Sequence, residues 1–153
     1  MSHSGRSVLV TGGSRGIGAA IASTLRARGA QVIGHASKAR DPDIIGADLT
    51  DPTAASRIWE EALERAGGRI DVLVNNAGLG RGYEGFLKSS AAEIDQMVDL
   101  NVTAAFHVTR ALAEGMAERK SGHIVQIGSI AALYPIGFPV YGATKGAVHL
   151  FSQ

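Results

Sequence analysis

The residues best suited to chemistry are a tyrosine and a lysine near the end of the printed sequence. Tyr141 and Lys145 are four residues apart, and in a helix this spacing places two side chains on one face, one turn apart. An ammonium group beside a phenol favours the phenolate form. The pair is therefore a candidate proton donor and acceptor. Two surface residues that merely share a helix face are the alternative.

A glycine-rich segment near the start of the chain is the second candidate site. Residues 11–18 read TGGSRGIG, between a short apolar run and a helical pattern. Glycines in this setting permit a tight turn and let the backbone approach a pyrophosphate, while the first amides of the helix point at the anion. The segment predicts a dinucleotide site, and a glycine-rich turn without a ligand is the alternative.

Three further polar groups follow predicted strands or lie on a predicted helix. The tetrapeptide NNAG at residues 75–78 follows the fourth strand, and Ser129 follows the fifth. Open α/β sheets bind ligands at the carboxyl ends of their strands, where a serine hydroxyl can donate to a substrate carbonyl. Asn101 falls on the apolar stripe of a helix, where a buried amide needs hydrogen-bond partners. An ordinary turn, a capping serine and a structural asparagine are the respective alternatives.

The elements that would position these groups alternate between strands and helices. Strands are expected at residues 7–11, 31–34, 44–47, 70–74 and 123–127. Helices are expected from 16 to about 28, from Asp51 as N-cap and Pro52 as first residue to about 66, from about 91 to 119, and from about 140. This order predicts a single domain with a doubly wound, parallel, Rossmann-like sheet and right-handed crossovers.

Composition narrows the class of protein. The sequence has 153 residues, of which 45% are hydrophobic and 19% are charged, as is typical of a globular fold. A net charge of +1 gives no electrostatic case for binding nucleic acid or a membrane surface. The chain lacks cysteine, which excludes disulfides and thiolate catalysis and is compatible with the cytoplasm. Its five histidines show no metal-ligand spacing, so we expect no metal site.

Taken together, these motifs closely resemble the short-chain dehydrogenases/reductases, and within them the group similar to 3-oxoacyl-[acyl-carrier-protein] reductases. The matching segments are TGGSRGIG at 11–18, Asp48-Leu49, NNAG at 75–78, Asn101, Ser129 and Tyr141-x-x-x-Lys145. The resemblance covers the whole chain. Family members run to about 250 residues, so we expect the sequence to be incomplete at its C-terminus and to lack the last strands of the family fold.

The resemblance implies four catalytic roles. Tyr141 would be the general acid in carbonyl reduction and the base in alcohol oxidation. Lys145 would favour the phenolate and hold the nicotinamide ribose, Ser129 would orient the carbonyl oxygen, and Asn101 would hold a water of a proton relay. The cofactor would be bound by Gly12, Ser14, Arg15, Gly16, Ile17, Gly18, Ser37, Lys38, Asp48, Leu49, Asn75, Ala77, Gly78, Tyr141 and Lys145.

The end of the second predicted strand indicates which cofactor is preferred. Family members that prefer NAD place an acid there to bind the ribose 2′-hydroxyl, whereas this chain has Ala36, followed by Ser37 and Lys38. Arg15 lies in the glycine-rich segment. A hydroxyl and two cations suit a 2′-phosphate, which predicts NADP(H).

The leading prediction is an NADP-dependent oxidoreductase acting on a small carbonyl or alcohol substrate. The apolar segments Leu79–Phe86 and Leu133–Val140 would line the substrate pocket, which suits a hydrophobic or acyl substrate. A nucleotide-binding or subunit-interaction fragment without turnover is the alternative, and a sugar-nucleotide epimerase shares the YxxxK pattern but differs in glycine spacing. The resemblance also implies a homo-oligomer, with the small residues Gly142, Ala143, Gly146 and Ala147 allowing close approach of helices.

Overall fold

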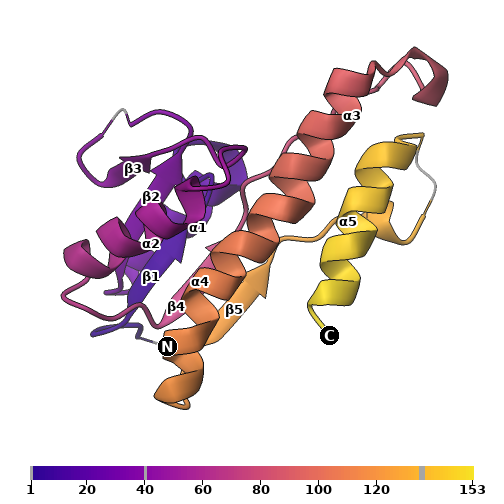
Figure 1. Ribbon diagram of the computed structural model, residues 1–153. Coiled ribbons are helices and arrows are strands. Elements are labelled where there is room, and N and C mark those ends of the chain that lie inside the picture. Colours follow the sequence, from indigo (N-terminus) through magenta and orange to yellow (C-terminus); the bar gives the residue numbers. More distant parts are fainter. Residues whose placement is uncertain (1, 40, 135–136) are drawn as a thin grey trace.

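A parallel sheet forms the centre of the molecule (Figure 1). The computed structural model describes residues 2–39, 41–134 and 137–153, and within them the strand order is β3-β2-β1-β4-β5. The strands are β1 (Ser7–Val10), β2 (Gln31–Ala36), β3 (Ile44–Gly46), β4 (Val72–Asn75) and β5 (His123–Gln126). The order reverses between β1 and β4, which marks the point where such sheets bind ligands. The predicted doubly wound parallel sheet is confirmed.

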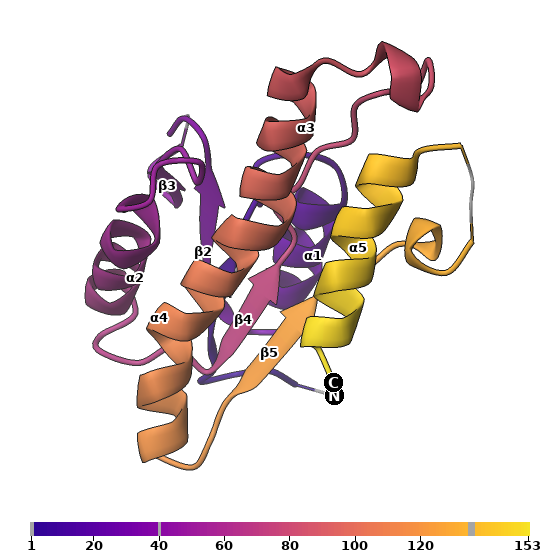
Figure 2. The ribbon, with the colours of Figure 1, turned by 45° about the vertical axis from the view of Figure 1, so that its right-hand side comes forward.

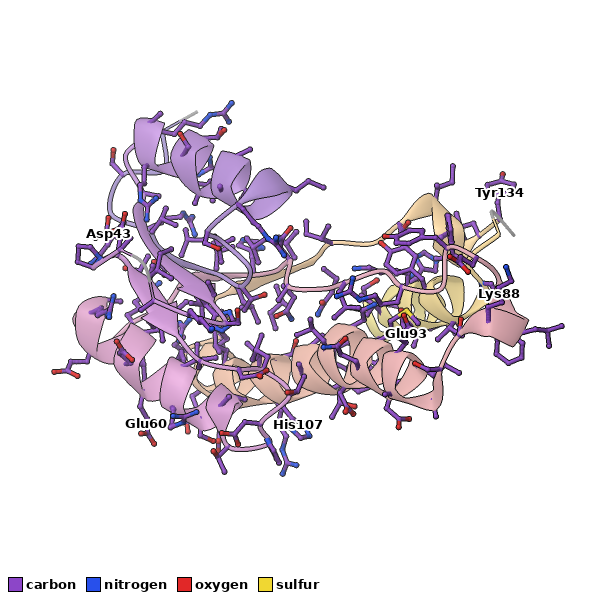
Figure 3. All side chains as sticks on the ribbon, turned by 90° about the horizontal axis from the view of Figure 1, so that it is seen from above. Asp43, Glu60, Lys88, Glu93, His107 and Tyr134 are labelled. Carbon is purple, nitrogen blue, oxygen red and sulfur yellow. The ribbon has the colours of Figure 1, made fainter. Side chains whose placement is uncertain are left out.

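Helices cover both faces of this sheet, as the view from above shows (Figure 3). One face packs against α1 (Gly16–Ala27), and the opposite face packs against α2 (Ala54–Arg65) and α4 (Ala104–Glu118). Because successive side chains of a strand point to opposite faces, Val8 and Val10 join Ala22 of α1 in one core, while Leu9 joins the other. Burying each such aliphatic side chain contributes roughly 1.5–3 kcal/mol.

The strand bounds differ slightly from the predictions. The first, third and fifth strands end one residue earlier than predicted, and β2 runs two residues further because Ala36 pairs with Gly46 of β3. The fourth strand begins at Val72 instead of residue 70. Just before it, the Asp71 carboxylate accepts a hydrogen bond of 3.0 Å from the amide of Ser7. The backbone of Asp71 also bonds to both neighbouring strands, since its amide donates to the carbonyl of Ser7 at 2.8 Å and its carbonyl accepts from the amide of His123 at 3.0 Å.

The start of α2 corrects one prediction. Asp51 is not the N-cap and Pro52 is not the first helical residue, since the helix begins at Ala54 after Thr53. The Asp51 carboxylate accepts from the amide and the hydroxyl of Thr53, at 2.8 Å each. This local turn competes with helix geometry and delays the helix by two residues.

The long helix predicted over residues 91–119 is three consecutive helical segments. These are α3 (Ala91–Val98), the π-helical turn η2 (Asp99–Thr103) and α4. A π turn accommodates one extra residue within a helix and is frequent at functional sites. Asn101 lies inside η2 and is buried. A helical hydrophobic pattern does not reveal such a turn, so the sequence prediction missed it.

The last helix, α5 (Pro139–Phe151), lies alongside α3 and α4 (Figure 2). It packs against η2, α3 and η3 (Ile130–Ala132), a 3₁₀ turn that begins directly after Ser129. A second 3₁₀ turn, η1 (Phe86–Lys88), precedes α3. Neither short turn was predicted. Pro135, between β5 and α5, lies outside the described residues.

Candidate functional site

The glycine-rich segment is locked to the loop after β4 by side chain and backbone together. The hydroxyl of Thr11 accepts hydrogen bonds from the amides of Asn76 and Ala77, at 3.0 Å each. In return, the side-chain amide of Asn76 donates to the carbonyls of Thr11 at 3.0 Å and Gly12 at 3.1 Å. Thr11 and Asn76 thereby join two of the predicted motifs. The sequence prediction did not single out these two residues, although both belong to the motifs it quoted.

Two glycines of this segment are required by space or by backbone conformation. A Cβ at Gly18 would lie 2.2 Å from the carbonyl oxygen of Gly12, a contact that backbone atoms cannot relieve locally. Gly16 has φ +54° and open space around its missing side chain. Among the described residues, none caps the start of α1 with a side chain, and its first turn contains no acidic residue. A helix start of this kind can bind an anion through its first amides.

The ends of β2 and β3 lie side by side, because the two strands pair up to Ala36 and Gly46. Ser37 and Lys38 follow β2 and are exposed, as are Ser14, Arg15 and Ile17 of the glycine-rich segment. Asp48, which is also exposed, accepts hydrogen bonds from the amide and hydroxyl of Thr50, and these bonds hold the pKa of Asp48 below its ordinary value. Leu49 is buried in the core beneath α2 and α4.

The NNAG tetrapeptide divides between packing and the site. The Asn75 side chain is buried and points to α4, where it donates to the Thr109 hydroxyl at 2.8 Å. Ala77 is half-buried and Gly78 is exposed. A Cβ at Gly78 would lie 3.0 Å from the side-chain oxygen of Asn101 and 3.7 Å from the Lys145 ammonium nitrogen. Gly78 therefore adjoins two of the predicted site residues.

The Asn101 amide connects three segments. It is 2% exposed. Its oxygen accepts from the amide of Leu79 at 2.8 Å, and its nitrogen donates to the carbonyl of Leu79 at 2.9 Å and to the Thr144 hydroxyl at 3.0 Å. The Thr144 hydroxyl in turn donates to the carbonyl of Tyr141 at 2.8 Å. Asn101 thus ties η2 to the loop after β4 and to the turn of α5 that carries Tyr141.

Lys145 lies inside this junction. The residue is 6% exposed, and its ammonium nitrogen donates a hydrogen bond to the carbonyl of Ile127 at 2.7 Å. Burial lowers the pKa of Lys145, because a cation is less stable away from water. Within the described residues, no carboxylate forms an ion pair with it. The ammonium is thus held at the carboxyl end of β5 by a backbone carbonyl.

Tyr141 and Ser129 lie at the two ends of the connection between β5 and α5. Tyr141 is half-buried, and a Cβ at Gly80 would lie 3.6 Å from its ring. Ser129 directly precedes η3, and its hydroxyl oxygen accepts a hydrogen bond from the amide of Ala131 at 3.2 Å. The first turn of α5 meets η3 closely, since a Cβ at Gly142 would lie 2.7 Å from the carbonyl oxygen of Ala131. The absence of a side chain at Gly142 therefore allows α5 to pack against η3 within this chain.

Two aromatic rings connect the segments predicted to line the substrate pocket. Tyr83, in the loop after β4, and Phe138, directly before α5, pack edge to face with ring centroids 5.0 Å apart. The Tyr83 hydroxyl would lie 3.0 Å from a Cβ at Gly80, which also adjoins the Tyr141 ring. The two segments therefore meet beside Tyr141. Part of the second segment, residues 135–136, lies outside the described residues.

Searches for two other kinds of site cover the described residues only. In that part of the chain, we find no helix that combines the length and hydropathy needed to span a bilayer. The same residues contain no group of three or more histidine, aspartate or glutamate side chains arranged to hold a metal ion.

Comparison with known proteins identifies the family. The sequence profile described as short chain dehydrogenase matches residues 6–153. The chain is 34% identical over 165 residues to the 3-oxoacyl-[acyl-carrier-protein] reductase FabG of Escherichia coli, covering 100% of this chain and 67% of that protein. It is 40% identical over 157 residues to an uncharacterized short-chain type dehydrogenase/reductase of Sinorhizobium fredii, covering 95% and 60%. The chain belongs to the short-chain dehydrogenase family.

Solved structures agree with this assignment. A metagenomic short-chain oxidoreductase in complex with NADP superposes with a TM-score of 0.87 at 35% identity, covering 99% of this chain and 75% of that one. A short-chain dehydrogenase from Streptomyces avermitilis gives the same TM-score at 36% identity, covering 99% and 60%. The chain spans 60–67% of the two curated relatives described above. The resemblance inferred from the motifs is confirmed.

Proposed function

We propose that the protein is an NADP-dependent oxidoreductase that reduces a carbonyl or oxidises a secondary alcohol. The observation that carries this proposal is the junction at the carboxyl ends of β4 and β5, where a Cβ at Gly78 would lie 3.0 Å from the Asn101 side-chain oxygen and 3.7 Å from the Lys145 ammonium nitrogen. Tyr141 lies one helical turn from Lys145, on the same element. Since the chain spans only part of its relatives' length, the proposal concerns the activity of the whole protein.

The residues of the glycine-rich segment fit a dinucleotide. The uncapped start of α1, with open space at Gly16, would hold the pyrophosphate through backbone amides. Ser14, Ile17 and Gly18 would contribute to the same cradle, and Ala77, Gly78 and the backbone of Asn75 would border it from the β4 side. Asp48 and Leu49 would adjoin the adenine. When bound, the cofactor supplies the hydride.

The chain's own residues would supply position, charge and a proton. The Tyr141 hydroxyl donates its proton to the carbonyl oxygen as negative charge develops there, and it removes a proton in the oxidation direction. The Lys145 ammonium stabilises the resulting phenolate, and the Ser129 hydroxyl donates a hydrogen bond that orients the carbonyl oxygen. Asn101 fixes the turn of α5 through Thr144 and would adjoin the water that relays protons to Lys145.

The preference for NADP rests on charge. Ala36 contributes no carboxylate at the end of β2. Ser37 and Lys38, which follow β2, and Arg15, in the glycine-rich segment, are exposed. A similar solved structure contains NADP. We expect Arg15→Ala to lower the ratio of NADPH to NADH affinity about tenfold, because one charge-assisted hydrogen bond to the 2′-phosphate is lost. Arg28→Ala, at the other end of α1, is the matched control, and an unchanged ratio in Arg15→Ala contradicts the assignment.

Turnover separates this proposal from a nucleotide-binding module without catalysis. The experiment is consumption of NADPH, followed at its nicotinamide absorbance band, over a panel of ketones that includes small ketones and 3-oxoacyl esters. Reduction of at least one ketone supports the oxidoreductase, and NADPH binding without turnover over the whole panel favours the module. FabG is named for its action on a 3-oxoacyl carrier-protein substrate, and we infer a hydrophobic or acyl substrate on that basis.

We also infer that the protein is a homo-oligomer, which sedimentation tests, and that it is located in the cytoplasm, which cell fractionation tests.

A further inference from the structure

His35 is the buried titratable group that the proposed mechanism does not use. It lies on β2 and is 3% exposed. His107, His123 and His149 are exposed by contrast. Desolvating an imidazole is unfavourable unless its polar atoms are partnered, so the contacts of this ring indicate what it does.

Both ring nitrogens of His35 face backbone groups of the candidate cofactor site. Nε2 lies 2.8 Å from the carbonyl oxygen of Ala47, at the end of β3. A carbonyl oxygen only accepts, so Nε2 carries the hydrogen and the neutral ring leaves Nδ1 as an acceptor. The amide of Gly12 donates to that Nδ1 at 3.5 Å, and the amide of Gly13 donates to the His35 carbonyl at 2.8 Å. The residue therefore spans the distance between the glycine-rich segment and the end of β3.

The charges around the ring favour its neutral form on balance. Burial lowers the pKa of His35, whereas the hydrogen bond to Ala47 and the negative charge of Asp48 act in the opposite direction. Asp48 is the charged group that acts on the ring from the β3 side, and it is itself engaged by Thr50. The neighbours that face the ring from the glycine-rich segment, Gly12 and Gly13, are uncharged. The amide of Gly12 can donate to Nδ1 only while the ring is neutral.

We propose that His35 is a positioning residue for the dinucleotide: the neutral ring holds Gly12 in its turn, and protonation turns Nδ1 into a donor that faces the Gly12 amide and displaces the glycine-rich segment. This inference rests on the proposed function, because it names the regulation of the same cofactor site. Protonation of His35 at acid pH would weaken NADPH binding by moving the backbone of the glycine-rich segment. The proton-transfer residues of α5 would stay in place. The expected signature is a rise in the KM for NADPH with little change in kcat.

The first test measures the dissociation constant of NADPH for four proteins from about pH 8 down to about pH 4.5, because burial lowers the pKa of His35 below the ordinary histidine value. They are the wild type, His35→Asn, His35→Gln and His107→Asn. An asparagine oxygen can replace Nδ1 as acceptor for Gly12, and a glutamine nitrogen can replace Nε2 as donor to Ala47, but neither titrates. His107 is exposed on α4, so His107→Asn is the matched control.

We expect wild type and His107→Asn to lose about tenfold more affinity over this range than His35→Asn, and His35→Gln to bind more weakly already at about pH 8. Titration of the cofactor's own phosphate is common to all four proteins and cancels in the ratios. Parallel pH profiles for wild type and His35→Asn would overturn the proposal. If His35→Asn does not fold, the same comparison with His35→Gln decides it.

The second test needs no cofactor. Nitrogen-15 NMR reports the tautomer of His35 and the amide shift of Gly12 as the pH falls. We expect an Nε2–H tautomer at neutral pH and a Gly12 amide that titrates with the same midpoint as the ring. An Nδ1–H tautomer, or a Gly12 amide that does not respond, overturns the proposal. If NADPH binds at no pH while Gly12 follows His35, the proposed function fails and the contact between ring and loop is supported.

Discussion

The helices α1 and α3 begin in opposite ways. The start of α3 is complete in itself: Ser90 accepts from the amide of Glu93 at 3.2 Å, and the Glu93 carboxylate accepts from the amide of Ser90 at 3.0 Å. Within the part of the chain that the structure describes, the start of α1 has no such side chain and begins with a glycine in open space. A capped helix start stabilises the fold, whereas an uncapped one leaves its amides available to a ligand.

The same contrast runs through the two halves of the candidate site. In the half around β1 and α1, the glycines lack side chains, and backbone segments can therefore approach one another closely. The half around η2 and α5 works by buried polar side chains, since Asn101, Thr144 and Lys145 each reach a backbone carbonyl or a hydroxyl. The first half should therefore be sensitive to added volume, and the second to lost polar groups.

Adding a methyl group at Gly18 should have the largest effect. The new Cβ would lie 2.2 Å from the carbonyl oxygen of Gly12 and 2.5 Å from the Asn76 amide nitrogen, so the glycine-rich segment must move. We expect Gly18→Ala to weaken NADPH binding by at least about 100-fold, which corresponds to about 3 kcal/mol. The matched control is Gly115→Ala on α4, where the nearest contact is a guanidinium nitrogen of Arg119 at 3.6 Å, an ordinary van der Waals distance. Equal NADPH affinities for the two variants would contradict the steric account.

Removing the Asn101 amide should destabilise the fold rather than only the site. Asn101→Ala leaves the Leu79 amide and carbonyl and the Thr144 hydroxyl without this partner, and we expect it to lower the free energy of unfolding by about 2–4 kcal/mol. Thr103→Ala, an exposed position of the same π turn, should change it by less than about 0.5 kcal/mol. Chemical denaturation measures both, and similar losses for both variants would remove the special role given to the Asn101 side chain.

Replacing the Lys145 ammonium should raise stability while abolishing turnover. The folded-state pKa of Lys145 is lowered by burial, so the folded chain disfavours the cation that it carries at neutral pH. This destabilisation is present below the folded pKa and is relieved as the pH rises towards the unfolded value. We expect Lys145→Met to raise the Tm by a few degrees at about pH 7. A Tm that falls would show that the bond to Ile127 outweighs the burial of charge.

The capping box of α3 should give the smallest effect and none on the site. Ser90→Ala removes the hydroxyl that accepts from Glu93, and we expect a loss of about 1 kcal/mol in the free energy of unfolding. The affinity for NADPH should remain that of the wild type, as measured by isothermal titration. A change in affinity would show that the starts of α1 and α3 are coupled.

The sequence predicted the parallel sheet and the family, because alternating strands and helices and the spacing of the motifs carry that information. It could not predict η2, since a π turn keeps the same hydrophobic stripe on either side: Met97 and Ala104 are both buried, with Asn101 between them. The start of α2 was missed because the side chain of Asp51 supports a turn as readily as a cap.

The remaining differences between prediction and structure concern contacts between residues that are far apart in the sequence. The sequence predicted a buried amide at Asn101 but not its bonds to Leu79 and Thr144, which are 22 and 43 residues away. It predicted Asn75 as a cofactor-binding residue but not that the Asn75 side chain donates to Thr109 of α4. The interactions of His35 depend on where β1 and β3 end relative to β2, which no local pattern specifies. The catalytic and cofactor roles of the residues stay predictions.

Substitution of the phenol tests the central claim most directly, namely that one half of the site binds the nucleotide and the other supplies the proton. In Tyr141→Phe, NADPH binding and ketone reduction are measured on the same preparation. We predict that turnover falls by about 1,000-fold, as expected for loss of a general acid, while the dissociation constant of NADPH changes by less than about twofold. Turnover close to that of the wild type in Tyr141→Phe would contradict the account.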